Sequence, residues 1–194
     1  MTKEKEYTRP IYLEVSSHFL HDAIDFKIRY RYCIDSDGPL FYEPKSRRTK
    51  CFVDLRMGIE SVLKAIVCYY TYNDRKGKTL VNWIEKFGHN IGKMVRKLDG
   101  EIPAEVLEPF KDDLLKLDQL PVGLRYRFDT WSFKDNKEAL YYDTIGCDRW
   151  LENLYQALDE LINHINSKLT PHSRIVSMAE MFKEMQEPRF EKHT

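Results

Sequence analysis

The sequence has few cysteines and no excess of one charge. Its 194 residues include four cysteines, and 31 basic residues balance 31 acidic ones. The cysteines form no C-x-x-C pair and lie far apart, at Cys33, Cys51, Cys68 and Cys147. This scatter argues against a zinc ribbon and against a disulfide scaffold. It predicts reduced thiols in a cytoplasmic protein.

Long hydrophobic runs are also missing. The longest apolar run, 62–70, is interrupted by Lys64 and is far shorter than the ~20 residues of a transmembrane helix. The first residues, MTKEKE, are polar and no apolar stretch follows them, so we expect no signal peptide and no membrane association. The balanced charge does not by itself require a nucleic acid or an acidic membrane as partner, but a local basic patch remains open.

Apolar residues recur at helical spacing along most of the chain, and no strand-like alternation persists. The pattern predicts an all-α, up-and-down helical bundle in a single domain, 1–194. The bundle is expected over 10–169, with an amphipathic helix and tail at 170–194 and a long irregular loop before the last long helix. The expected helices cover 11–32, 51–72, 80–87, 90–98, 104–120 and 151–169.

Two short motifs are the most informative part of the sequence. The first is 58–65 (GIESVLKA) on a strongly patterned helix, and the second is 88–91 (GHNI), with Leu98 after it. A basic and aromatic segment, 124–127 (LRYR), and a long final helix follow in that order. Together these features resemble the HEPN superfamily of small α-helical bundles, across the whole of the expected bundle.

The resemblance implies a bundle that commonly dimerises and takes part in RNA processing, toxin–antitoxin pairs or antiviral defence. Active members are metal-independent ribonucleases with an Arg-x(4–6)-His motif near the last long helix. Arg149 lies at the start of that helix here. The positions where the histidine would fall hold Leu154, Tyr155 and Gln156. We therefore expect a HEPN-like homodimeric module without the intact nuclease motif, which binds RNA or a protein partner in a bacterial defence or stress system.

Arginines interleaved with aromatic residues are the predicted nucleic-acid contacts, because arginine can bind phosphate while aromatic faces stack on bases. The alternative is that the aromatic rings pack on the bundle and the arginines pair with nearby aspartates. A second group of basic residues lies before Lys50, in a segment expected to be a solvated loop. The candidate contacts are Arg125, Tyr126, Arg127, Trp131, Arg47 and Arg48.

His89 is the candidate catalytic residue, because it follows a glycine at a helix start. An imidazole there can cap backbone N–H groups or bond to a neighbouring helix, and it can also transfer a proton. The second possibility leads to an alternative function, a metal-independent ribonuclease with rearranged residues in which His89 and Arg125 come together in the fold.

Four residues on the first helix have the spacing of a metal-binding stripe. His18, His21, Asp22 and Asp25 stand at i, i+3, i+4 and i+7, which places them on one face. A second helix would have to supply further ligands, and no matching Glu-x-x-His occurs elsewhere. The alternative is a solvated polar face, and no metal or cofactor is expected.

Overall fold

The computed structural model describes residues 9–35, 44–120 and 142–172. All regular structure in these residues is helical. The predicted all-α bundle is therefore confirmed. In the described part of the chain no helix is both long enough and apolar enough to cross a membrane.

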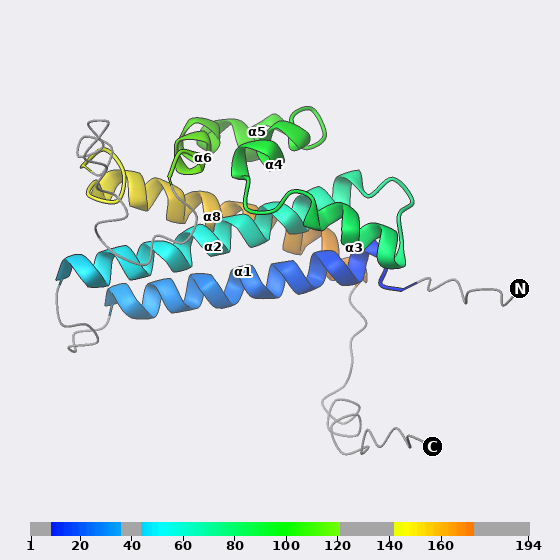
Figure 1. The fold of residues 1–194 in the computed structure, drawn as a ribbon, viewed down its shortest axis with the longest axis horizontal. Coiled ribbons are helices and arrows are strands. Elements are labelled where there is room, and N and C mark those ends of the chain that lie inside the picture. Colours follow the sequence, from blue (N-terminus) through cyan, green and yellow to red (C-terminus); the bar gives the residue numbers. More distant parts are fainter. Residues whose placement is uncertain (1–8, 36–43, 121–141, 173–194) are drawn as a thin grey trace, which may run out of the picture.

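Three long helices form the body of the bundle: α1 (Tyr12–Asp35), α2 (Pro44–Thr71) and α8 (Asp148–Leu169). Figure 1 shows α1 and α2 side by side and running in opposite directions, with α8 along them in the direction of α2. The chain can enter α8 in this direction only after it has returned along the molecule.

Short helices make that return and form a lobe beside α2 (Figure 1). Gly100, at φ +75°, follows the end of α4, since a left-handed backbone suits glycine. A single turn of 3-10 helix that includes Pro109 divides the predicted 104–120 helix into two pieces. The first element, α3 (Gly77–Glu85), lies near the start of α1, where the Gly77 N–H donates to the Pro10 carbonyl. The lobe itself consists of α4 (Ile91–Leu98), α5 (Ala104–Leu107), η1 (Glu108–Phe110) and α6 (Lys111–Asp118).

The core is centred on α2, which is covered by α1, α8 and the lobe. Its apolar side chains are fully buried over more than three turns, including Phe52, Leu55, Ile59 and Leu63. Gly58 lets the neighbouring helices come close: a Cβ atom there would lie 2.9 Å from the Leu158 side chain. The first motif of the sequence therefore lies at the most crowded part of the bundle.

Two helix starts differ from the prediction. Helix α2 begins at Pro44, so the segment before Lys50 is helical and the predicted solvated loop is wrong there. Proline suits the first position of a helix, because its fixed φ is already helical and its missing N–H has no intrahelical partner to lose. Helix α8 begins at Asp148 instead of Leu151, and Cys147 occupies the N-cap position.

Two predicted segments lie largely outside the described residues. The expected irregular loop covers 121–148, of which 121–141 lie outside the described residues and 142–147 are mostly turns. The expected C-terminal amphipathic helix also falls outside, except for η3 (Thr170–His172), one turn of 3-10 helix directly after α8.

Candidate functional site

A buried carboxylate on α2 is the centre of the candidate site. The Glu60 side chain is 3% exposed. Its oxygens accept hydrogen bonds from Lys64 Nζ at 2.7 Å and from His89 Nδ1 at 2.9 and 3.0 Å. A buried carboxylate needs such partners, because an unpaired charge in the interior costs several kcal/mol (order of magnitude). The contact joins the two motifs of the sequence, which lie 29 residues apart.

Helical spacing places the basic partners of Glu60 on its own helix. Arg56, Glu60 and Lys64 stand at i, i+4 and i+8, so they form one stripe along α2. Arg56 is 2% exposed and donates from Nη1 to the Leu117 carbonyl at 2.7 Å. Burial lowers the pKa of Arg56, and the nearby charges of Glu60 and Asp118 oppose that shift. Arg56 and Glu60 are therefore turned away from solvent. The Lys64 ammonium lies over the Phe19 ring of α1, 5.7 Å from its centroid.

The turn before α4 holds the imidazole of His89 in a defined position. Gly88 adopts φ +55°, and the Asn90 side chain caps α4 by accepting from the Lys93 N–H at 2.6 Å. Since a carboxylate can only accept, Nδ1 of His89 must donate to Glu60. In the neutral ring this leaves Nε2 as the acceptor. The His89 side chain is 54% exposed although its partner is buried.

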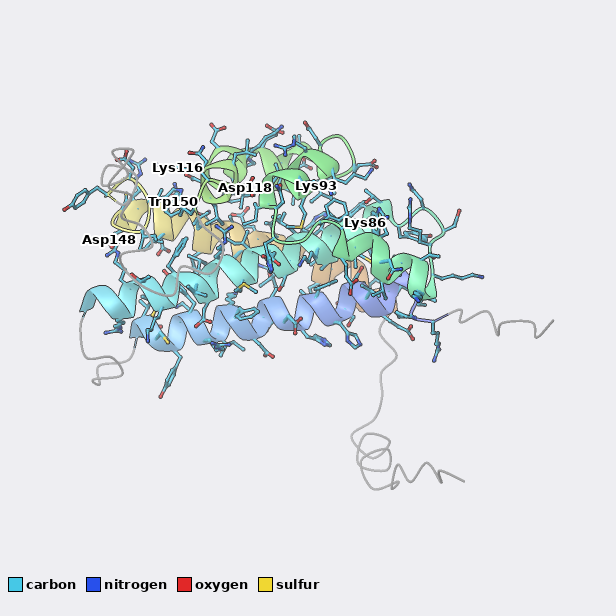
Figure 2. The ribbon with its side chains drawn as sticks, viewed as in Figure 1. Lys86, Lys93, Lys116, Asp118, Asp148 and Trp150 are labelled. Carbon is cyan, nitrogen blue, oxygen red and sulfur yellow. The ribbon has the colours of Figure 1, made fainter. Side chains whose placement is uncertain are left out.

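Exposed basic residues flank His89 in the sequence. Residues 86–98 contain four lysines and arginines and no acidic residue. Four exposed side chains of this segment are called here the α4 basic face. Lys93 Nζ donates to the Lys86 carbonyl at 2.8 Å, so the two lysines are neighbours, and Figure 2 shows them together beside α4. The members of the α4 basic face are Lys86, His89, Lys93 and Arg96.

The buried charges below this face are compensated within the protein. Lys64 balances Glu60 at 2.7 Å. Asp118 lies against Gly92, where its Oδ2 is 2.7 Å from the position of a Cβ atom, and its charge interacts with buried Arg56. Arg96 Nη1 lies 3.3 Å from the same Cβ position, so Asp118 is near Arg96 as well as Arg56 and offsets part of the positive charge of the face. The arrangement suits an anionic ligand that also offers a hydrogen bond to His89.

Two of the predicted RNA contacts are engaged inside the protein. Arg47 donates to the carbonyls of Cys33 and Ile34 at 2.7 and 2.6 Å, at the end of α1. Arg48 donates to the Ile145 carbonyl and pairs with Asp148 at 2.6 Å. Both guanidinium groups therefore tie α2 to its neighbours.

The other four predicted contacts lie outside the described residues. They are Arg125, Tyr126, Arg127 and Trp131. Whether Arg125 meets His89 is therefore an open prediction.

The predicted metal stripe on α1 is exposed along its whole length, at His18, His21, Asp22 and Asp25. Within the described ranges no three histidine, cysteine, aspartate or glutamate side chains come close enough to share a metal ion. His18 and His21 instead line an open hollow of about 530 Å³ between the start of α1 and the end of α8, together with Glu14.

Burial of the charged stripe on α2 is the feature that the sequence analysis missed. Arg56, Glu60 and Lys64 stand at helical spacing in the sequence, and such a stripe is usually a solvent-exposed row of ion pairs. The signal for burial was also present, because apolar residues occur on nearly every other side of α2. A helix that is apolar all round is usually buried, so its charged residues must find partners inside the fold.

Comparisons with known proteins identify no family for this chain. No protein-family model matches the chain. Neither the curated proteins nor the solved structures contain a significant match.

Proposed function

We propose that the chain is a HEPN-like helical module that binds single-stranded RNA in the cytoplasm, as part of a bacterial defence or stress system. The observation that carries the proposal is the contact between Glu60 and His89. It joins the two motifs on which the resemblance depends, and it holds an exposed imidazole within a basic segment of the chain. The two motifs meet at one buried carboxylate, which supports treating them as parts of a single site.

Binding is favoured over cleavage, because the Arg-x(4–6)-His motif is incomplete after Arg149. The second candidate is a metal-independent ribonuclease, and one observation favours it. Nδ1 of His89 is held by Glu60 while half of the imidazole is open to solvent, which is how a carboxylate positions a histidine for proton transfer.

The module is further proposed to act as a homodimer through the outer face of α1. Two large side chains one turn apart on that helix are strongly exposed, Ile28 at 59% and Tyr32 at 66%. Sedimentation-velocity ultracentrifugation tests this part, since the apparent mass must rise with concentration. A mass of 23.2 kDa at all concentrations would exclude it.

One experiment separates the two functions. The purified chain is incubated with end-labelled single-stranded RNA in EDTA, and both retention and cleavage are measured. Retention of intact RNA supports the binding module. Cleavage that is lost in His89→Ala supports the ribonuclease. If the RNA is neither retained nor cut, the proposal is wrong and a protein partner becomes the better explanation.

A further inference from the structure

The α4 basic face has the chemistry to distinguish RNA from DNA. We propose that Lys86, Lys93 and Arg96 bind the phosphates of a single strand, while Nε2 of His89 accepts a hydrogen bond from a ribose 2′-hydroxyl. This inference rests on the proposed RNA binding and goes beyond it, because it assigns the surface and the chemical group that is read. It uses a different set of residues from the arginines expected from the sequence.

The cations of this face are available for a strand of phosphates. Lys86, Lys93 and Arg96 are exposed, and no acidic residue interrupts the segment that carries them. The Lys93 ammonium lies against the Lys86 carbonyl and over the Phe87 ring, with 5.0 Å between Nζ and the ring centroid. It is held on the surface by a carbonyl and an aromatic face, and these leave its positive charge uncancelled. Phosphate binding by such groups supplies most of the affinity for a nucleic acid and makes it depend on salt.

His89 adds selectivity for RNA over DNA, because the buried Glu60 carboxylate fixes which ring nitrogen carries the proton. Glu60 accepts from Nδ1 through both of its oxygens, at 3.0 and 2.9 Å. When the ring is neutral, the Nε2 atom on its other side is an acceptor, and the 2′-hydroxyl of RNA is a donor that DNA lacks. Glu60 is a positioning residue in this scheme, since it is 3% exposed and cannot touch the nucleic acid.

The observations favour RNA over an acidic peptide. An acidic peptide would be bound by positive charge alone. Its carboxylates have no hydrogen to donate, so an acceptor nitrogen on His89 would not help to bind them. In the neutral ring the lone pair on Nε2 would repel a carboxylate oxygen and would attract a hydroxyl hydrogen.

The test measures binding of two oligonucleotides that differ only in the 2′-hydroxyl. Fluorescently labelled 20-mers of uridine and deoxyuridine are titrated with the full chain in EDTA at several salt concentrations, and a gel checks that the RNA stays intact. The variant K86E/K93E/R96E reverses three charges on the face. The matched control K76E/K78E/K168E reverses three exposed lysines on other elements. His89→Ala and Glu60→Gln test the selectivity, and thermal unfolding of every variant checks that it is folded.

We expect K86E/K93E/R96E to weaken the binding of both oligonucleotides at least about tenfold. The slope of log affinity against log salt concentration should become shallower by about 2, at roughly 0.7 per lost phosphate contact. The control variant K76E/K78E/K168E should change the salt dependence of binding less than K86E/K93E/R96E does. Wild type should prefer the RNA by about fivefold, as expected for one hydrogen bond. His89→Ala should remove that preference with little effect on the salt slope. Glu60→Gln should reduce the preference while the imidazole remains.

Each failure has its own meaning. If wild type retains RNA but K86E/K93E/R96E behaves like the control, this surface is the wrong one and the proposed RNA binding still stands. If the preference for RNA is absent, or survives in His89→Ala, the 2′-hydroxyl contact is wrong. If polyglutamate competes as well as RNA at equal charge, the face binds acidic peptides and not RNA. If wild type retains neither oligonucleotide, the proposed function and this inference fall together.

Discussion

Two residues of the 58–65 motif serve different purposes, although they are only two positions apart. Gly58 faces α1 and α8, where any side chain would meet Leu158 at 2.9 Å and Phe26 at 3.3 Å. Glu60 faces the lobe and is the common acceptor for Lys64 and His89. The glycine of the motif therefore serves packing, and the carboxylate serves the candidate site.

Gly58→Ala is expected to destabilise the fold by about 1–3 kcal/mol, the usual cost of an extra methyl group in a close-packed core. Urea unfolding measures the change. The double variant Gly58→Ala/Leu158→Ala should lose less than the sum of the two single variants, because the clashing side chain is then absent. Additive losses would show that the contact with Leu158 is not the cause. Gly100→Ala is a useful comparison, since nothing lies within 4 Å of that position and only its positive φ opposes a side chain.

Glu60→Ala is expected to cost about 3 kcal/mol in the free energy of unfolding, because it leaves the largely buried Lys64 without its acceptor and removes the negative charge near buried Arg56. Glu60→Gln should cost less, since the amide oxygen can still accept. Chemical denaturation of both variants at neutral pH tests this order. A loss below about 1 kcal/mol for Glu60→Ala would mean that water replaces the carboxylate easily.

At the scale of the element, the ends of the helices are held by side chains from other helices. Arg47 of α2 donates to two carbonyls at the end of α1, and Arg48 of α2 contacts both Ile145 and Asp148 at the start of α8. The last carbonyls of a helix lack intrahelical partners, so a guanidinium group there replaces solvent. The first turns of α2 therefore contact both the end of α1 and the start of α8.

Arg47→Ala is expected to destabilise the protein by about 1.5–3 kcal/mol, the contribution of hydrogen bonds to a charged group. Hydrogen exchange followed by mass spectrometry should show faster exchange over the last turn of α1, with little change in α4. Lys50→Ala, another basic residue of the same helix region, is the matched control. Equal exchange at the end of α1 in both variants would contradict the role of Arg47.

The contact between α2 and α8 makes stability depend on pH. Tyr70 and His164 share a hydrogen bond of 2.9 Å and their rings stack. Burial, helped by the charge of Lys168, lowers the pKa of His164 below its ordinary value. The unfolded chain therefore binds the proton more readily than the folded chain.

Stability from His164 should be fully present above about pH 6.5, the ordinary pKa of histidine, and should be lost as the pH falls below it. Urea unfolding at pH 7.5 and pH 5.5 measures the loss. His164→Gln removes the titrating group, so its loss over the same interval should be smaller than that of wild type. A wild-type loss equal to that of His164→Gln would show that other groups cause the pH dependence.

Helix identity was largely predictable from the sequence, whereas helix ends and partners were not. Apolar spacing predicted α1, α3, α4 and α8 within a few residues. It missed the start of α2 by seven residues, at Pro44 instead of Cys51, because the first turns of α2 are polar. In those turns Arg47 and Arg48 donate to carbonyl groups outside α2. Spacing along one helix contains no information about such partners.

The candidate site was predictable only in part, for the same reason. His89 was recognised as a candidate from its place after a glycine at a helix start. Its partner Glu60 was recognised only as a motif residue, and the contact between them depends on how the lobe packs on α2. Arg47 and Arg48 were predicted to bind RNA because they are basic, but the structure gives their guanidinium groups carbonyl and carboxylate partners within the fold.

At the scale of the whole molecule, the interior is held together without covalent cross-links among the described residues, where the four cysteines are free thiols. Burial raises the pKa of Cys51 to about 12, with nearby Cys33 as a further cause, and raises the pKa of Cys68 to about 11. Both groups are therefore protonated at neutral pH. Since the thiolate is the reactive form, they are inert while the fold is closed.

Alkylation of Cys51 and Cys68 at pH 8 should therefore report opening of the whole bundle. We expect both to react at one common slow rate, which rises with urea, while the half-buried Cys147 reacts faster. Mass spectrometry after timed iodoacetamide labelling separates the sites. Fast labelling of Cys68 alone would show that the α1 side of α2 opens locally, because its thiol contacts the Tyr12 carbonyl at 3.6 Å.

The direction of α8 has a consequence for synthesis of the chain on the ribosome. The α1–α2 hairpin is local in sequence, so it can close as soon as it emerges. The surface of α2 that receives α8 stays bare until about a hundred more residues are translated, including the lobe that brings α8 back. At a typical rate of about 5–20 residues per second, this exposed interval lasts roughly 5–20 seconds. A nascent chain that stalls before Asp148 presents Phe52, Leu55 and their neighbours to chaperones and proteases instead of to its own last helix.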